Sequence, residues 1–104
     1  MNRLTIATLC AVLILPVAAP MPASAKTIER ACLQSDRAQG KRALCGCIQA
    51  AADATLSQRD QKMGAKFFTD PHAAQEVRQS DRRTHEQFWL RWRSFGETAE
   101  ALCS

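Results

Sequence analysis

Apolar residues recur at the spacing of α-helices through most of the chain, and the alternation that marks β-strands does not persist over five residues. The chain has no Tyr, and β-branched residues are few after Lys26. The clearest apolar stripe lies in the segment 41–56. It consists of Leu44, Ile48, Ala51 and Thr55, with Cys45, Ala52 and Leu56 beside it. The pattern predicts an all-α fold, a small bundle of about four to five helices.

Cap and turn residues divide this pattern into predicted helices. Ser57 followed by Asp60 resembles a capping box, and Asp70-Pro71 combines a cap residue with a proline at the first helical position. Gln39-Gly40 supplies a turn. The predicted helices run from Thr27, as the cap, to about Arg37; from about Lys41 to Leu56; from the Ser57 cap to about Phe68; from Pro71 to about Gln79; and from Ser80-Asp81 onwards.

The last of these helices is the longest and has a wide apolar face. Its apolar residues fall within about 100° of one another around the helix axis. They are Phe88, Trp92, Phe95, Ala99, Leu102 and Cys103. On the opposite side, Arg82 with Glu86 and Arg93 with Glu97 have the i, i+4 spacing of ion pairs. We therefore expect the apolar face to pack against the rest of the bundle.

The first 25 residues are typical of an export signal. Arg3 precedes an apolar run over residues 4–15, and Ala23-Ser24-Ala25 is an A-x-A cleavage motif. The run ends at Pro16 and is shorter than the ~20 apolar residues of a membrane-spanning helix. We expect a cleavable signal peptide over residues 1–25, and a single helical domain over 26–104 that is periplasmic or secreted and has no stable membrane span.

Four cysteines remain once the signal, with Cys10, is removed. An even number of cysteines in a short exported domain is typical of a disulfide framework. Because Cys45 and Cys47 are separated by one residue, each is expected to bond to Cys32 or Cys103. Cys32 and Cys47 lie at equal distances along the chain from the predicted turn, which favours the bonds Cys32–Cys47 and Cys45–Cys103. The alternative pairing is Cys32–Cys45 with Cys47–Cys103. Loop entropy predicts ~3 kcal/mol from the shorter bridge and ~4 kcal/mol from the longer one.

Composition argues against several classes of function. Without Arg3, the domain has 13 of the 14 Lys and Arg residues against 10 Asp and Glu, a net charge of +3, which is far below the density of a nucleic-acid binder. His72 and His85 show no metal-ligand spacing, and Met63 falls on an apolar stripe. We find no catalytic motif. We expect no nucleic-acid partner, no metal, no cofactor and no enzymatic activity.

Two sets of residues are candidates for contact with a partner. Trp89 lies at the edge of the apolar face beside His85 and Arg93, where a partly exposed ring suits a carbohydrate, a peptide or an anionic headgroup. Arginine forks that receive carboxylate or phosphate groups make up the second set. It consists of Arg78, Arg82 and Arg83. Both sets also have an explanation without a ligand. Trp89 can pack at the rim of the core, and the arginines can belong to a solvated helix start.

These observations favour a non-enzymatic exported protein that acts by binding an envelope protein or ligand. The alternative is thiol–disulfide exchange through Cys45 and Cys47. Closely spaced thiols exchange disulfides when the pKa of one of them is lowered near a helix N-terminus.

Four segments resemble a family of small exported alphaproteobacterial proteins with four cysteines. They are Ile28-Glu29-Arg30-Ala31-Cys32, Leu44-Cys45-Gly46-Cys47-Ile48-Gln49, Arg78-Gln79-Ser80-Asp81 and Phe95-Gly96-Glu97-Thr98-Ala99-Glu100. The role of that family is uncharacterised, and some members carry the label "arginine transporter". The resemblance implies a further alternative, an accessory protein or small-solute binder linked to arginine transport. A domain without a membrane span is not itself a permease.

Overall fold

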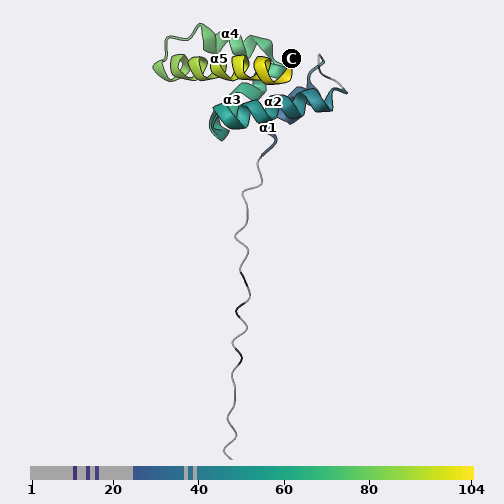
Figure 1. Cartoon of the computed structure of the whole chain (residues 1–104). Helices are drawn as coiled ribbons and strands as arrows, with labels where there is room; N and C mark the ends of the chain where they lie inside the picture. Colours follow the sequence, from purple (N-terminus) through teal and green to yellow (C-terminus); the bar gives the residue numbers. More distant parts are fainter. Residues whose placement is uncertain (1–10, 12–13, 15, 17–24, 37, 39) are drawn as a thin grey trace, which may run out of the picture.

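The computed structural model describes residues 11, 14, 16, 25–36, 38 and 40–104 of the 104-residue chain. Within this part, all regular structure is helical (Figure 1). The helices are α1 Thr27–Gln34, α2 Arg42–Thr55, α3 Gln58–Thr69, α4 Pro71–Arg78 and α5 Arg83–Cys103. The predicted all-α bundle is confirmed. The predicted signal segment and its cleavage motif lie mostly outside the described residues and stay predictions.

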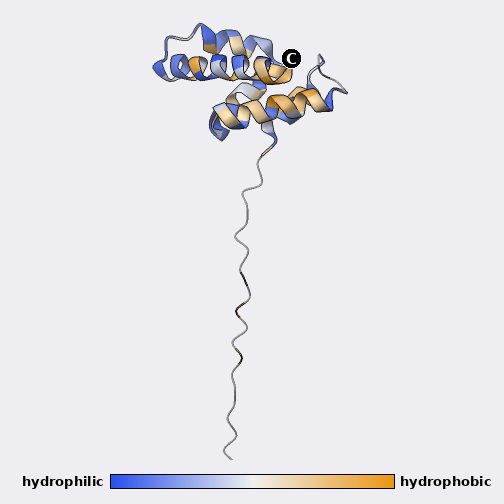
Figure 2. Ribbon diagram, in the orientation of Figure 1, coloured by the Kyte–Doolittle hydropathy of each residue, from blue (hydrophilic) through white to orange (hydrophobic). Residues whose placement is uncertain are grey.

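The helices are arranged so that α4 and α5 run side by side and α1, α2 and α3 pack on one side of them (Figure 1). α1 packs on α2 and α3, α2 packs on α5, and α4 packs on α3 and α5. Figure 2 shows that α2 is apolar along most of its length, whereas the first turns of α5 are mostly hydrophilic. Among the described residues, no helix is both long enough and apolar enough to cross a membrane.

The core forms around α2. One buried cluster consists of Ile28, Ala51, Ala52, Leu56 and Phe95, and a second of Cys32, Ala38 and Cys45. Ile48 and Phe68 pack against both clusters and join them. The predicted apolar face of the last helix is correct except at Leu102, which is 61% exposed. The bond of Cys103 to Cys47 turns one side of the last turn toward α2, and Leu102 lies about 100° away around the helix.

Aromatic rings surround a close contact between α3 and α5. The centroid of the Trp92 ring lies 5.2 Å from that of Phe67, 5.9 Å from that of Phe88 and 4.8 Å from that of Phe95. Gly64 of α3 allows this approach, because a Cβ atom at this position would overlap the six-membered ring of Trp92. The indole is therefore held between the phenyl rings and the backbone of α3.

Two of the predicted helix caps are confirmed. Ser57 Oγ accepts a hydrogen bond from the Asp60 N–H at 3.1 Å, and the Asp70 side chain accepts one from a backbone N–H in the first turn of α4. The predicted start of the last helix at Ser80-Asp81 is wrong. Ser80 Oγ accepts from the Arg82 N–H in a turn, and α5 begins after Arg82.

The first helix departs from the prediction at both ends. Thr27 is its first residue rather than its cap. Gln49 of α2 takes over the capping role, because its Oε1 accepts from the Glu29 N–H at 2.8 Å. The helix ends at Gln34, short of the predicted end at residue 37, which lies outside the described residues. The Ser35 hydroxyl donates to a carbonyl one turn back at 2.7 Å and competes with a further helical turn.

A buried polar network joins the first three helices. Gln49 Nε2 donates to Asp53 Oδ1 at 2.8 Å and to Gln61 Oε1 at 2.9 Å. Gln61 Nε2 in turn donates to the Leu56 carbonyl at 3.3 Å. Both glutamines are almost fully buried, and the network satisfies polar groups that would otherwise be desolvated without a partner.

The structure has the alternative disulfide pairing, and the favoured one is wrong. Cys32 bonds to Cys45 and Cys47 bonds to Cys103, with Cα–Cα distances of 5.6 and 5.8 Å. The early end of α1 is the reason. The connection between α1 and α2 is centred on residue 38, midway between residues 34 and 42. Cys32 lies six residues before this centre and Cys45 seven after it, so Cys45 rather than Cys47 faces Cys32.

Candidate functional site

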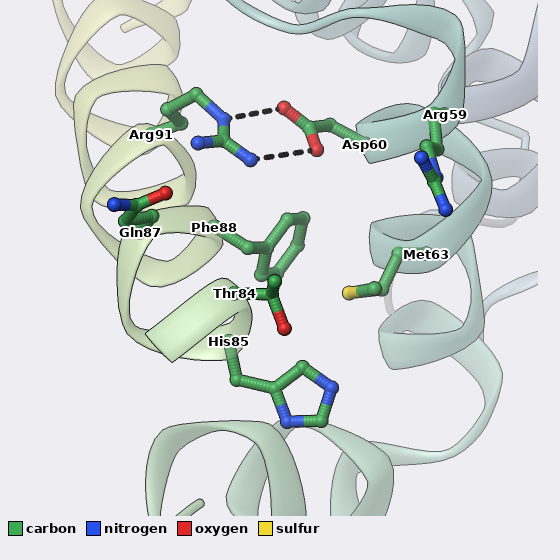
Figure 3. A pocket seen from close by; sticks show the side chains of 8 residues that line it. All are labelled: Arg59, Asp60, Met63, Thr84, His85, Gln87, Phe88 and Arg91. Carbon is green, nitrogen blue, oxygen red and sulfur yellow. Dashed lines mark hydrogen bonds and ion pairs between the residues drawn. The ribbon is translucent and has the colours of Figure 1, made fainter. Parts of the chain in front are cut away.

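Two adjoining surface regions combine charged and apolar side chains. The first is the set predicted from the sequence, which we term the Trp89 surface: Trp89, His85, Arg93, Arg78, Arg82 and Arg83. The second, the α3–α5 cleft, is a cavity of about 260 Å³ between the first turns of α3 and α5 (Figure 3). α3 contributes Arg59, Asp60 and Met63 to its lining, and α5 contributes Thr84, His85, Gln87, Phe88 and Arg91. His85 belongs to both regions.

The Trp89 surface is built from the end of α4 and the first half of α5. Trp89 is half-buried, as the sequence predicts, and Cζ of Arg78 lies 6.0 Å from the centroid of its ring, within the range of a cation–π contact. Within α5, His85, Trp89 and Arg93 follow one another at intervals of four residues. Residues at this interval lie on one side of a helix. The structure therefore places these three residues on one side of α5, with Arg78 over the Trp89 ring, and Arg82 immediately precedes the helix.

The arginines of this surface make no ion pair with any residue that the structure describes. Neither Arg82 and Glu86 nor Arg93 and Glu97 approach within 4.0 Å, although their spacing allows a pair. Arg83 is the first residue of α5 and lies about 120° around the helix from Trp89, so it does not share the face of Trp89. The exposed guanidinium groups of the surface are thus available to an acidic partner.

A nearly buried carboxylate lies at one end of the α3–α5 cleft. The Asp60 side chain is 10% exposed and accepts two hydrogen bonds from Arg91, one from Nε at 2.7 Å and one from Nη2 at 3.1 Å (Figure 3). A bidentate pair of this kind is the strong form of an ion pair. The hydrogen bond that Arg91 donates to Asp60 raises the pKa of Arg91 above its ordinary value. The pair fixes the first turn of α3 against α5.

The reciprocal half of the predicted capping box does not form. Ser57 accepts from the Asp60 N–H, but the Asp60 carboxylate faces Arg91 instead of returning to the backbone of Ser57. The sequence pattern therefore identified a helix start correctly and missed the ion pair, which joins residues 31 positions apart.

His85 is oriented by the turn that precedes α5. Its Nδ1 lies 2.7 Å from Ser80 Oγ, and the same hydroxyl oxygen accepts from the Arg82 N–H at 3.2 Å. When Ser80 donates its proton to Nδ1, the imidazole carries its own proton on Nε2. In this tautomer the Nε2–H group remains a hydrogen-bond donor at the edge of the cleft.

The C-G-C pair is the junction of two separate bridges. Cys45 bonds to Cys32, and both are almost fully buried, whereas Cys47 and Cys103 are half-buried. None of these four cysteines is a thiol in this structure. Among the described residues, no three His, Cys, Asp or Glu side chains gather as a metal site requires.

A larger cavity of about 500 Å³ lies elsewhere, between the C-terminal turn of α3 and the connection from α1 to α2. Its walls are mainly apolar, with Leu44, Ile48, Phe67 and Phe68, and Asp36 is its one charged side chain among the described residues. The smaller α3–α5 cleft differs in composition, because it brings several polar and charged groups together beside two apolar side chains, Met63 and Phe88.

Of the residues that line the α3–α5 cleft, His85 was the only member of the predicted contact surface. Arg59, Asp60 and Arg91 come together only because α3 and α5 meet at Gly64 and Trp92. A long-range contact of this kind leaves no periodic signal in the sequence. The one local signal in the sequence was Arg59, a charged residue that follows the predicted cap Ser57 by two positions.

The fold and the bridges together define a small disulfide-stapled helical protein. No family model, no curated protein and no solved structure matches the chain. The resemblance to a family of exported four-cysteine proteins therefore stays a prediction, as does the label that some of its members carry.

Proposed function

We propose that this chain is a non-enzymatic protein of the periplasm or cell exterior that acts by binding an envelope protein through the Trp89 surface. The observation that carries the proposal is the contact of Arg78 with the half-buried ring of Trp89, beside arginines that have no described ion-pair partner. Tryptophan and arginine are, with tyrosine, the residue types enriched among the energetic centres of protein interfaces.

The two disulfides support a site of action outside the cytoplasm. Bridges of this kind form and persist in oxidising compartments, and small secreted domains depend on them. Cys32–Cys45 and Cys47–Cys103 together use every cysteine after residue 25.

The charge of the surface specifies the partner's chemistry. Arg78, Arg82 and Arg93 are exposed, and guanidinium groups bind carboxylates through paired hydrogen bonds. A partner protein that complements this surface has an acidic patch opposite the arginines and an apolar group that covers Trp89. This arrangement increases the rate of encounter and the specificity of binding more than the affinity.

A role in thiol–disulfide exchange is less well supported. Cys45 and Cys47 are bonded to different partners rather than to each other. An exchange enzyme would have to open one of these structural bridges in each cycle. The geometry therefore favours binding over exchange.

The test is affinity capture from a detergent extract of the cell envelope with the oxidised protein as bait. The variant Trp89→Ala removes the ring, and Lys62→Ala, at an exposed position on α3 outside the surface, is the matched control. We expect the native protein and Lys62→Ala to retain one acidic protein that Trp89→Ala loses. Circular dichroism and a thiol assay establish that both variants are folded and oxidised. Equal capture by all three proteins would refute the role of this surface.

A further inference from the structure

We propose that the α3–α5 cleft binds a small organic molecule that has one carboxylate group and an apolar body. The site is distinct from the Trp89 surface, apart from His85 at their common edge. The inference does not depend on the identity of a protein partner.

The charge of the cleft favours an anion. Asp60 and Arg91 neutralise each other, because both carboxylate oxygens accept from the guanidinium. Arg59, which precedes Asp60 in the sequence, is exposed and forms no ion pair with any other described residue. Arg59, Asp60 and Arg91 together give the lining a net charge of +1. A cationic ligand would meet Arg59 without an available carboxylate.

The donors of the cleft suit a planar carboxylate. A guanidinium has five N–H groups, and Asp60 engages two of those on Arg91, so further N–H groups remain for a ligand. Arg59 has a second guanidinium group. His85 can donate from its Nε2–H group when its Nδ1 accepts a hydrogen bond from Ser80. Arginine is the side chain best shaped for bidentate contact with carboxylates.

The rest of the ligand is apolar. Met63, which is half-buried, projects from α3 toward the space between Arg91 and His85 in Figure 3 and offers the apolar contact, and the almost fully buried ring of Phe88 lines the same cavity. A thioether beside a phenyl ring forms an adaptable apolar wall. The volume of about 260 Å³ is below the roughly 300–1,000 Å³ of sites for larger ligands. A molecule with a single ring or a short aliphatic chain therefore fits this cleft.

The cleft is pre-formed, which favours binding of a small ligand. The Asp60–Arg91 pair closes one end, and the packing of Gly64 against Trp92 fixes the distance between α3 and α5. A ligand consequently orders few groups when it binds, and the loss of conformational entropy is small.

The test uses benzoate as the probe, titrated into the oxidised protein and followed by the NMR shifts of backbone amides in α3 and α5. Benzamide has the same shape without the charge, benzylamine reverses the charge, and inorganic phosphate supplies an anion without an apolar body. We expect saturable shifts with benzoate and binding about tenfold or more weaker with each of the other three probes. Equal binding of benzoate and benzamide, tighter binding of benzylamine or phosphate, or no shift with benzoate would overturn the proposal.

The variants assign the binding to the cleft. Arg59→Gln should weaken benzoate by about tenfold or more, and Arg59→Lys should retain part of the affinity because it keeps the charge. Arg42→Gln changes another exposed arginine, in the first turn of α2, and should bind as the native protein does. Unchanged affinity in Arg59→Gln would overturn the proposal. Since benzoate binding is measured without any protein partner, its outcome is separate from that of the capture experiment.

Discussion

Gly64 allows a direct test of the packing between α3 and α5. Both Gly64 and Gly96 lie inside helices, so replacement by alanine makes the same chemical change in the same kind of backbone. Their surroundings differ. A Cβ atom at Gly64 would overlap the ring of Trp92, whereas a Cβ atom at Gly96 has no neighbour within 4 Å among the atoms described.

The expected effects have opposite signs. Alanine is favoured over glycine inside a helix by roughly 0.5–1 kcal/mol, so Gly96→Ala should raise the free energy of unfolding by about that amount. The same gain applies at Gly64, but overpacking of a filled core costs about 1–3 kcal/mol, and overlap with three ring carbons of Trp92 places this cost in the upper half of that range, at about 2–3 kcal/mol. Trp92 cannot easily move aside, because it is in contact with Phe67 and Phe95. Gly64→Ala should therefore lower the free energy of unfolding by about 1–2 kcal/mol.

Urea unfolding followed by far-UV circular dichroism measures both effects. The midpoint should fall for Gly64→Ala and rise for Gly96→Ala, with the same dependence on urea concentration in both proteins. The two variants should thus differ by about 2–3 kcal/mol. An equal rise in stability for both variants would show that α3 and α5 are not in contact at Gly64 and would refute this account of the packing.

Further predictions concern the bridges and the buried network. Mild reductant should open Cys47–Cys103 before Cys32–Cys45, because the first pair is half-buried and the second is 1% and 0% exposed. Mass spectrometry after alkylation should find two labelled cysteines before four, and simultaneous labelling of all four would contradict the prediction. Replacement of Cys47 and Cys103 by serine should lower the free energy of unfolding by about 4 kcal/mol, as loop entropy predicts for a long loop; an unchanged urea midpoint would argue against the bond. Gln49→Leu should lower it by about 2–3 kcal/mol, since buried polar partners lose their hydrogen bonds, and native stability in this variant would contradict the network.

Local signals in the sequence predicted the helices well, because the forces that begin a helix act over three or four residues. The Ser57 and Asp70 caps formed as predicted. The exceptions were the start of α5, which begins after Arg82, and α1, whose Glu29 amide in the first turn is capped by Gln49 from another helix. The sequence around Thr27 contains no information about a contact 20 residues away. The early end of the same helix at Ser35 then moved the turn and changed the disulfide pairing.

The candidate sites were predictable to different degrees. The position of Trp89 at the edge of an apolar stripe indicated that the ring is partly exposed, because the helical period alone determines that position. The contact of Trp89 with Arg78 depends on how α4 packs against α5, and the cleft depends on the meeting of Asp60 and Arg91. Such contacts follow from tertiary packing, which the spacing of residues within one helix does not specify.

The two bridges also impose an order on the maturation of the chain. In the export that we propose, the chain emerges from its N-terminus, so Cys32 and Cys45 would both be accessible to an oxidant while Cys103, 56 residues beyond Cys47, is still to emerge. The local bridge can close first and remove Cys45 from competition before the last helix arrives. The remaining two sulfurs then have a single way to pair, so the native connectivity can be reached without an isomerase.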